Sequence, residues 1–289
     1  MKLNKNQELF AKIQDNFTVE IYRKYENKIK EIINNNANDE KKIMQEIANI
    51  ILNYEVSKEV MKLSNIEKKQ VKQKLNALIE ATFMAQITFN KDFLENLLAE
   101  VIKDKINSNN FLINYALKPV KQNVINKILN EKINGKNYSD RIYSNGNKVA
   151  KRMKKEVDLF INGKTTVNEI SNRISKEFNI NKNLIKRLAN NEIARTQNRA
   201  DEIWRKEHNI KKVMYAATLD MKTCEHCAAL DGKIYDNDKA PTLPKHIRCR
   251  CCLIAIIDEN WKPQQRYSNK DRTNIDWKDY QTWLKEQQK

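Results

Sequence analysis

The 289-residue sequence has only four glycines and four prolines, and no glycine precedes Gly135. A β-rich fold needs such residues at its many turns, so the first half of the chain is predicted to form long helices instead. The longest apolar run, residues 251–257, is far too short to cross a bilayer. No apolar segment follows Met1 and Lys2 as a signal peptide would require. We therefore expect no membrane association.

Cysteine is absent outside residues 224–252, where all five cysteines of the chain lie. A secreted disulfide framework would spread its cysteines along the chain, so we expect synthesis in a reducing compartment. Most enzyme motifs are also missing. The sequence has no glycine-rich phosphate loop, no G-x-S-x-G elbow and no H-E-x-x-H. It also lacks the H-x-E and P-C-x-x-C pair of zinc deaminases, because Thr223 precedes Cys224.

We therefore expect that the protein is not an enzyme. The alternative is a zinc-containing nuclease or another DNA-processing enzyme, for which His226, His246 and Asp231 are the available residues. No spare pair of histidines stands at the spacing of a ββα nuclease site.

Positive charge is abundant: 54 lysines and arginines against 37 acidic residues give a formal net charge of +17 and a pI near 9.5. One interpretation is attraction to nucleic acid or another polyanion, which makes non-specific DNA a candidate partner. The other is a compositional bias that coats helix faces with lysine, since the lysines are spread along the chain. No recognition-helix motif predicts sequence-specific binding.

Apolar residues recur at three- and four-residue steps through the first half, as on the buried stripe of a helix. They predict one helix over residues 6–33, a break at the Asn-rich stretch 34–39, and a second helix ending near Tyr54. A third helix is predicted to begin near Ser64, with Glu67 at the capping-box position. Helical patterns continue over residues 93–106 and 111–133, with Pro119 as a start or kink. We interpret residues 1–135 as a helical region whose stripes are packing surfaces of a bundle; the alternative is that some of them face a partner protein.

The stretch GKNYSDRIYSNGN, residues 135–147, contains two glycines and is predicted to be the domain boundary. Helices are then predicted over 147–161, from a cap at Thr166 with Glu169, and from Asn181 to Lys206. Strands are predicted over 213–218, 233–235 and 252–257, the second entered by a turn at Asp231 and Gly232.

Residues 136–257 are thus predicted to form a small module of helices and an antiparallel sheet, and the whole chain an α+β fold. Residues 258–289 contain Trp261, Trp277 and Trp283. We interpret them as an arm that ends in a short amphipathic helix over 276–287. The arm is expected to dock on the body or on a neighbouring subunit, because exposed tryptophans make a poor surface.

A metal site is predicted within residues 220–252. Cys224 and Cys227 form a C-x2-C pair, and eighteen residues separate it from the H-x2-C pair of His246 and Cys249. Two such pairs joined by a loop supply the four corners of a tetrahedral Zn²⁺ site, and four protein ligands are typical of a structural ion. Cys251 is an alternative fourth ligand, because it lies two residues beyond Cys249 and on the same face of an extended chain. Cys252 is then expected to point into the core.

An ordered series of short motifs resembles the phage head morphogenesis family, the Mu F-like minor head proteins. The series covers roughly residues 139–257 and consists of Ala194-Arg195-Thr196, Tyr215-Ala216-Ala217-Thr218-Leu219-Asp220, Lys222-Thr223-Cys224-x-x-Cys227, Leu230-Asp231-Gly232-Lys233 and Pro244-x-His246-x-x-Cys249-Arg250-Cys251. Two residues depart from the family pattern. Gln197 occupies the position of the glutamate in the usual R-T-E motif, and Lys222 occupies a position where arginine is common.

The resemblance implies a minor capsid protein of the virion interior, made in the host cytoplasm, that associates with the portal and with other capsid or scaffold proteins during procapsid assembly. It also makes the packaged DNA a candidate partner. Within the module, Arg195 is expected to brace the first cysteine pair by forking onto Asp220 or Asp231. The alternative for Arg195 is a solvated helix residue. Gly232 is expected to have a structural role in its turn.

Overall fold

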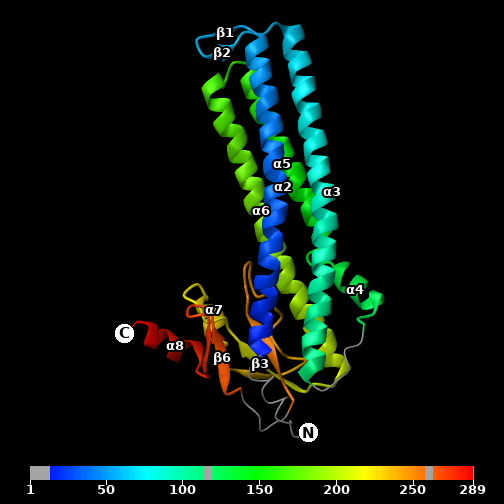
Figure 1. Cartoon of the computed structure of the whole chain (residues 1–289), viewed down its shortest axis with the longest axis vertical. Helices are drawn as coiled ribbons and strands as arrows, with labels where there is room; N and C mark the ends of the chain where they lie inside the picture. The colour runs from blue at the N-terminus through cyan, green and yellow to red at the C-terminus, as the bar shows by residue number, and fades with distance from the viewer. Residues whose placement is uncertain (1–13, 113–118, 258–262, 289) are drawn as a thin grey trace. The chain divides into compact units, whose positions relative to one another are not determined.

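The computed structural model describes residues 14–112, 119–257 and 263–288. The described chain is mostly helical with small antiparallel sheets, so the predicted α+β class is confirmed (Figure 1). It divides into two compact units: unit 1 contains residues 1–26, 97–131 and 190–289, and unit 2 contains residues 27–96 and 132–189. The predicted linear division into 1–135, 136–257 and 258–289 stays a prediction. None of the described helices has the length and apolar content that crossing a membrane requires.

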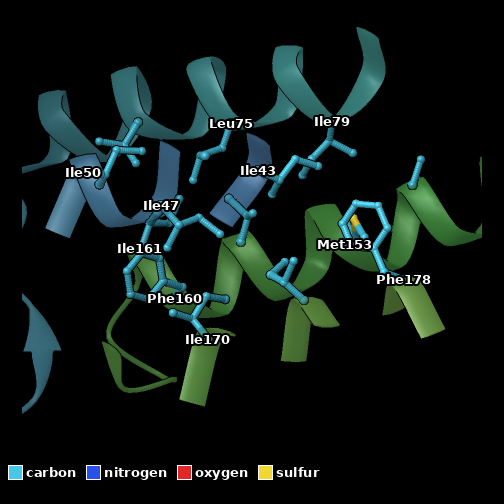
Figure 2. Packing of buried hydrophobic residues seen from close by; sticks show 14 of the residues in the cluster. Ile43, Ile47, Ile50, Leu75, Ile79, Met153, Phe160, Ile161, Ile170 and Phe178 are labelled. Carbon is cyan, nitrogen blue, oxygen red and sulfur yellow. The ribbon is translucent and has the colours of Figure 1, made fainter. Parts of the chain in front are cut away.

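Unit 2 is a bundle formed by parts of α2 (Gln14–Asn53), α3 (Asn65–Leu112) and α6 (Val167–Glu207) together with α5 (Tyr138–Ile161). A hairpin of β1 (Val56–Ser57) and β2 (Val60–Met61) connects α2 to α3 (Figure 1). Figure 2 shows the core, in which side chains of all four helices meet: Ile43, Ile47, Ile50, Leu75, Ile79, Met153, Phe160, Ile161, Ile170 and Phe178. Burying each such side chain contributes roughly 1.5–3 kcal/mol. The apolar stripes of the sequence are therefore packing surfaces.

The predicted break at residues 34–39 is wrong, because α2 runs through the Asn-rich stretch without interruption. Ile32 and Ile43 are both buried, and their spacing of eleven residues returns to the same helix face after about three turns. Packing on both sides of the stretch outweighs the low helix propensity of asparagine. Asn36 lies on the same stripe, is only 5% exposed, and has no hydrogen-bond partner for its side chain among the described residues.

The predicted loop at residues 135–147 is also mostly helix, because α5 already begins at Tyr138. Asn137 accepts a hydrogen bond from the backbone N–H of Asp140 and the Asp140 carboxylate accepts one from Asn137, which forms a capping box. Gly146 lies inside the helix, where a Cβ atom would stand 2.6 Å from Cγ1 of Ile87. This glycine therefore allows close packing of α5 on α3.

Other predicted interruptions are absent from the described helices. The single helix α3 covers the helix predicted from Ser64 and the separate pattern predicted over residues 93–106. The helix predicted to reach residue 133 ends earlier, because α4 (Gln122–Leu129) is the helix that forms beyond Pro119 among the described residues. No helix starts at Asn181, which lies within α6 and donates a hydrogen bond to Gln86 Oε1 at 3.0 Å. The predicted capping boxes of Ser64 with Glu67 and of Thr166 with Glu169 are confirmed.

Unit 1 contains the predicted three-stranded antiparallel sheet, in the order β4 (Ile234–Asp236), β3 (Lys212–Ala216), β5 (Cys252–Ile256). The strands agree with the prediction to within two residues. Alternate residues serve two cores: one face packs Val213, Tyr215, Cys251 and Leu253, and the other packs Met214, Ala216, Cys252 and Ile254. Cys252 therefore points away from the other cysteines, as expected.

The C-terminal segment packs on this sheet module, which agrees with the predicted docking of the arm on the body of the protein. It contains a hairpin that the sequence did not predict, β6 (Gln265–Ser268) and β7 (Thr273–Asp276), and then α8 (Tyr280–Gln287), which is capped by Asp279. Tyr280 and Trp283 are buried against Leu219 and Ala228. Trp261 lies outside the described residues.

Candidate metal centre

The first cysteine pair is positioned by one turn of helix, α7 (Glu225–Ala228). Cys224 is the N-cap residue, and its Sγ atom accepts a hydrogen bond from the backbone N–H of Cys227 at 3.5 Å. One helical turn therefore places both sulfurs on the same side. His246 Nε2 lies 3.3 Å from the sulfur of Cys224 and 3.3 Å from that of Cys227. The two predicted pairs thus meet in space.

A second set of sulfurs adjoins the first. The ligand atoms of Cys227, Cys249 and Cys251 lie within 4.8 Å of one another, as do those of Cys224, Cys227 and His246. Cys227 belongs to both sets, so all five predicted residues gather around it. An ion held by Cys224, Cys227 and His246 would find its fourth ligand in Cys249 or Cys251. The structure is compatible with either thiol as the fourth ligand.

Proton sharing among the sulfurs is compatible with metal binding. Hydrogen bonding from Cys251 lowers the pKa of Cys227 to about 4 and the pKa of Cys249 to about 7. The same two contacts raise the pKa of Cys251 well above its usual value. The proton of the Cys251 thiol therefore favours the thiolate forms of both Cys227 and Cys249. The thiolate is the form that binds a cation, and a divalent ion at this position would replace that proton.

Two further contacts orient the candidate ligands. His246 Nδ1 lies 2.9 Å from the carbonyl oxygen of Ile247, and this hydrogen bond is the main cause of the raised pKa of His246. With the proton on Nδ1, the lone pair of Nε2 faces the two sulfurs. The hydroxyl of the buried Tyr215 donates a hydrogen bond to Cys227 Sγ at 3.3 Å. Nothing in the sequence marked Tyr215 for this contact, because it comes from a neighbouring strand.

The loops that carry the ligands are held by two acidic residues with arginine partners. Asp220 forms an ion pair with Arg250, which lies between Cys249 and Cys251. Asp231 forms an ion pair with Arg266 at 2.6 Å, and the two side chains are each 1% exposed. The sequence singled out both aspartates but did not identify either partner.

Gly232 follows Asp231 with a φ of +74°, a conformation that favours glycine. Its N–H donates to the carbonyl oxygen of Tyr215 at 2.9 Å. The turn therefore directs the chain into β4, beside β3.

The predicted fork of Arg195 onto Asp220 or Asp231 is wrong. Arg195 is buried, and its Nε atom donates to Glu192 on the same helix at 2.7 Å. Its terminal nitrogen NH1 is 3.9 Å from Glu131, so the solvated alternative is wrong as well. Gln197 is also buried, and both polar atoms of its side chain lack a partner among the described residues.

The remaining histidines lie outside the cluster. His226 is exposed on α7. His208 follows the end of α6, where its Nδ1 atom lies 2.8 Å from the carbonyl oxygen of Trp204 and its ring stacks on the Trp204 indole. His208 therefore caps the end of α6 rather than contributing to the cluster.

Comparison with known proteins bears on the segment that contains this centre. Residues 144–254 match the family described as Phage Mu protein F like protein. This segment is similar to the phage Mu F-like family. The Mu F-like segment includes all five candidate ligands, whereas Arg266 and α8 lie beyond it. No curated protein and no solved structure matched the chain.

The family indicates a phage head morphogenesis protein, with other capsid proteins as its partners and the virion as its location. The resemblance predicted from the sequence motifs is therefore confirmed.

Proposed function

We propose that this chain is a phage minor head protein that acts in procapsid assembly while bound to the portal. In this proposal a structural zinc ion joins α7 to the loop before β5, both within the Mu F-like segment. The observation that carries it is the convergence of Cys224, Cys227 and His246 with Cys249 and Cys251 inside that segment.

The donor set fits zinc rather than a hard cation. Thiolate and imidazole are the ligands that Zn²⁺ prefers, and calcium or magnesium would require oxygen. Five donors are available for four corners, so protein atoms can fill the whole coordination sphere. A closed sphere leaves no position for a substrate or a reactive water, which favours a structural ion. The ion would cross-link α7 to the loop before β5.

The alternative function, a zinc nuclease, gains no support from the surroundings. Its carboxylate would be Asp231, which is 1% exposed and accepts hydrogen bonds from Ala217, Arg266 and Tyr280. A general base or an additional metal ligand would need a free carboxylate oxygen. His226 is exposed on the short helix α7 rather than gathered with His246.

The helical residues up to 135 are the proposed region for portal or capsid contact. Support comes from apolar side chains around the β1–β2 hairpin: Leu52 is 83% exposed, Ile66 is 72% exposed, and Val56 is also exposed. Exposed apolar groups that lie near one another in the chain are consistent with a protein-binding surface.

Affinity purification of the full chain from phage-producing cells tests this function. We expect portal and capsid proteins to co-purify and elemental analysis to find about one zinc per chain. Isolated heads should contain the protein, and a Cys224→Ser variant should enter them poorly. The proposal is overturned if the purified chain cleaves DNA in a metal-dependent reaction that His246→Ala abolishes without unfolding the protein.

A further inference from the structure

The acidic residues of α5 and the first half of α6 are all engaged in local contacts. Residues 138–189, which the structure describes throughout, contain twelve lysines and arginines but only five acidic residues. Asp140 and Glu169 belong to helix caps, and Glu156, Asp158 and Glu177 form ion pairs with Arg173, Lys72 and Arg152 respectively. The positive charge of this segment is therefore left mostly uncompensated.

Three exposed cations lie along the line where α5 and α6 meet. Two ion pairs, Arg152 with Glu177 at 2.7 Å and Arg173 with Glu156 at 3.0 Å, hold the two helices side by side within unit 2. We call the exposed basic residues beside these pairs the basic seam: Lys148, Lys155 and Lys176.

Helical spacing places the members of the basic seam together. Lys148 and Lys155 lie four residues before and three residues after Arg152, so both are its neighbours on the surface of α5. Lys176 lies three residues after Arg173 and is therefore its neighbour on the surface of α6. None of the three residues has an ion-pair partner within the part of the chain that the structure describes.

We propose that the basic seam binds the phosphate backbone of double-stranded DNA without reading its sequence. The seven residue steps from Lys148 to Lys155 rise about 10 Å along the helix axis. A DNA strand presents about three phosphates over that length. The proposal gives the candidate DNA partner a defined surface and depends on the head-protein function only for the presence of DNA.

The composition of the seam favours nucleic acid over an acidic protein. Protein interfaces are usually anchored by apolar or aromatic side chains and are depleted in lysine. The only large apolar side chain exposed in residues 138–189 is Tyr143, which is not a member of the seam. Asn179 and Asn183 are also exposed on α6 and add hydrogen-bond donors for phosphate oxygens.

The test is a titration of a mixed-sequence DNA duplex with the zinc-loaded full chain over a series of salt concentrations. The logarithm of the association constant should fall linearly with the logarithm of the salt concentration. A triple variant, Lys148→Gln, Lys155→Gln and Lys176→Gln, should weaken binding to every sequence alike. It should also reduce the slope by about 3, since each lost phosphate contact removes about 0.9.

A matched control removes the same charge elsewhere in unit 2: Lys58→Gln, Lys62→Gln and Lys69→Gln, all exposed and close to Glu55, Glu59 and Glu67 in the chain. The control variant should retain the wild-type slope, and both variants should keep the wild-type melting temperature and zinc content.

Three results would overturn the basic seam as a DNA site. The first is a wild-type chain without salt-dependent DNA binding. The second is an equal loss of affinity in the two triple variants, which would indicate bulk charge. The third is a seam variant that keeps its DNA affinity and loses co-purifying capsid proteins, which would make the seam a protein-binding surface. Failure of the head-protein proposal would appear separately, as absence from isolated heads or as a chain without zinc.

Discussion

The guanidinium of Arg266 forks onto the carboxylate of Asp231, with nitrogen–oxygen distances of 2.6 and 3.2 Å. Both side chains are 1% exposed, and Arg266 also stacks over the ring of Trp277. Asp231 accepts two more hydrogen bonds, from the backbone N–H groups of Ala217 and Tyr280. One buried ion pair therefore joins the end of β3, the turn before β4 and the start of α8.

Replacement of Arg266 by alanine should destabilise unit 1 by about 3–5 kcal/mol, because it leaves the Asp231 carboxylate buried and uncompensated. Urea unfolding followed by tryptophan fluorescence measures this change. The control is Arg250→Ala, which breaks the pair with Asp220. The Arg250 side chain is 40% exposed, so the cost of that change should be at most about 1 kcal/mol. Equal losses for the two variants would contradict the importance of burial.

Removal of a metal ligand should abolish zinc binding and the folded sheet module together. Cys224→Ser and Cys227→Ser are expected to contain no zinc by elemental analysis, and chelation of the wild type should lower its melting temperature. Cys252→Ala is the control, since Cys252 packs with Met214 and Ile254 on the opposite face. If Cys252→Ala loses zinc as readily as Cys224→Ser, the ligand set is wrong.

The fourth ligand is decided by a pair of variants that differ in one sulfur. Cys249→Ser and Cys251→Ser each remove one thiol within reach of Cys227. The variant that retains one zinc per chain identifies the thiol that does not bind the ion. Loss of zinc from both variants would indicate that the second thiol is needed to hold the site together.

Gly146→Ala should destabilise unit 2 by about 1–3 kcal/mol, because the new methyl group would overlap Ile87 in a packed helix interface. Thermal unfolding measures the effect, and Asn147→Ala on the exposed side of α5 serves as the control. Combining Gly146→Ala with Ile87→Ala should cost less than the sum of the two single changes, since the smaller side chain makes room. Additive losses would contradict direct contact.

Asn36→Ala should stabilise unit 2 by about 1–2 kcal/mol. The substitution removes two buried polar atoms without partners and raises the helix propensity of α2. Asn35→Ala, at an exposed position one residue earlier, should contribute only the propensity gain of a few tenths of a kcal/mol. A destabilised Asn36→Ala variant would show that the amide is satisfied by a group such as bound water.

Local signals in the sequence predicted much of the fold. The capping boxes at Ser64 and Thr166 depend on residues three apart, and the strands depend on apolar runs of about five residues, so both are visible in a short window. The pairing of Cys224 and Cys227 with His246 was predictable for a related reason. Metal ligands come in closely spaced pairs whose chemistry restricts what they bind.

Interactions between distant segments were not predictable in the same way. The Asn-rich stretch 34–39 and the glycines of residues 135–147 predict interruptions, but packing against neighbouring helices keeps α2 and α5 intact. Arg266 lies 35 residues beyond Asp231, and no spacing rule connects the two. No local pattern therefore identifies Arg266, rather than Arg195, as the partner of Asp231.

The reach of the Arg266–Asp231 pair sets the limits of any fragment made for study. A piece cut to the matched residues 144–254 would begin inside α5, without the Asn137 cap, and would end before Arg266. It would leave Leu219 and Ala228 open to solvent where Tyr280 and Trp283 now cover them. Such a piece is expected to aggregate, whereas a fragment extended to residue 288 would keep Leu219 and Ala228 covered by Tyr280 and Trp283.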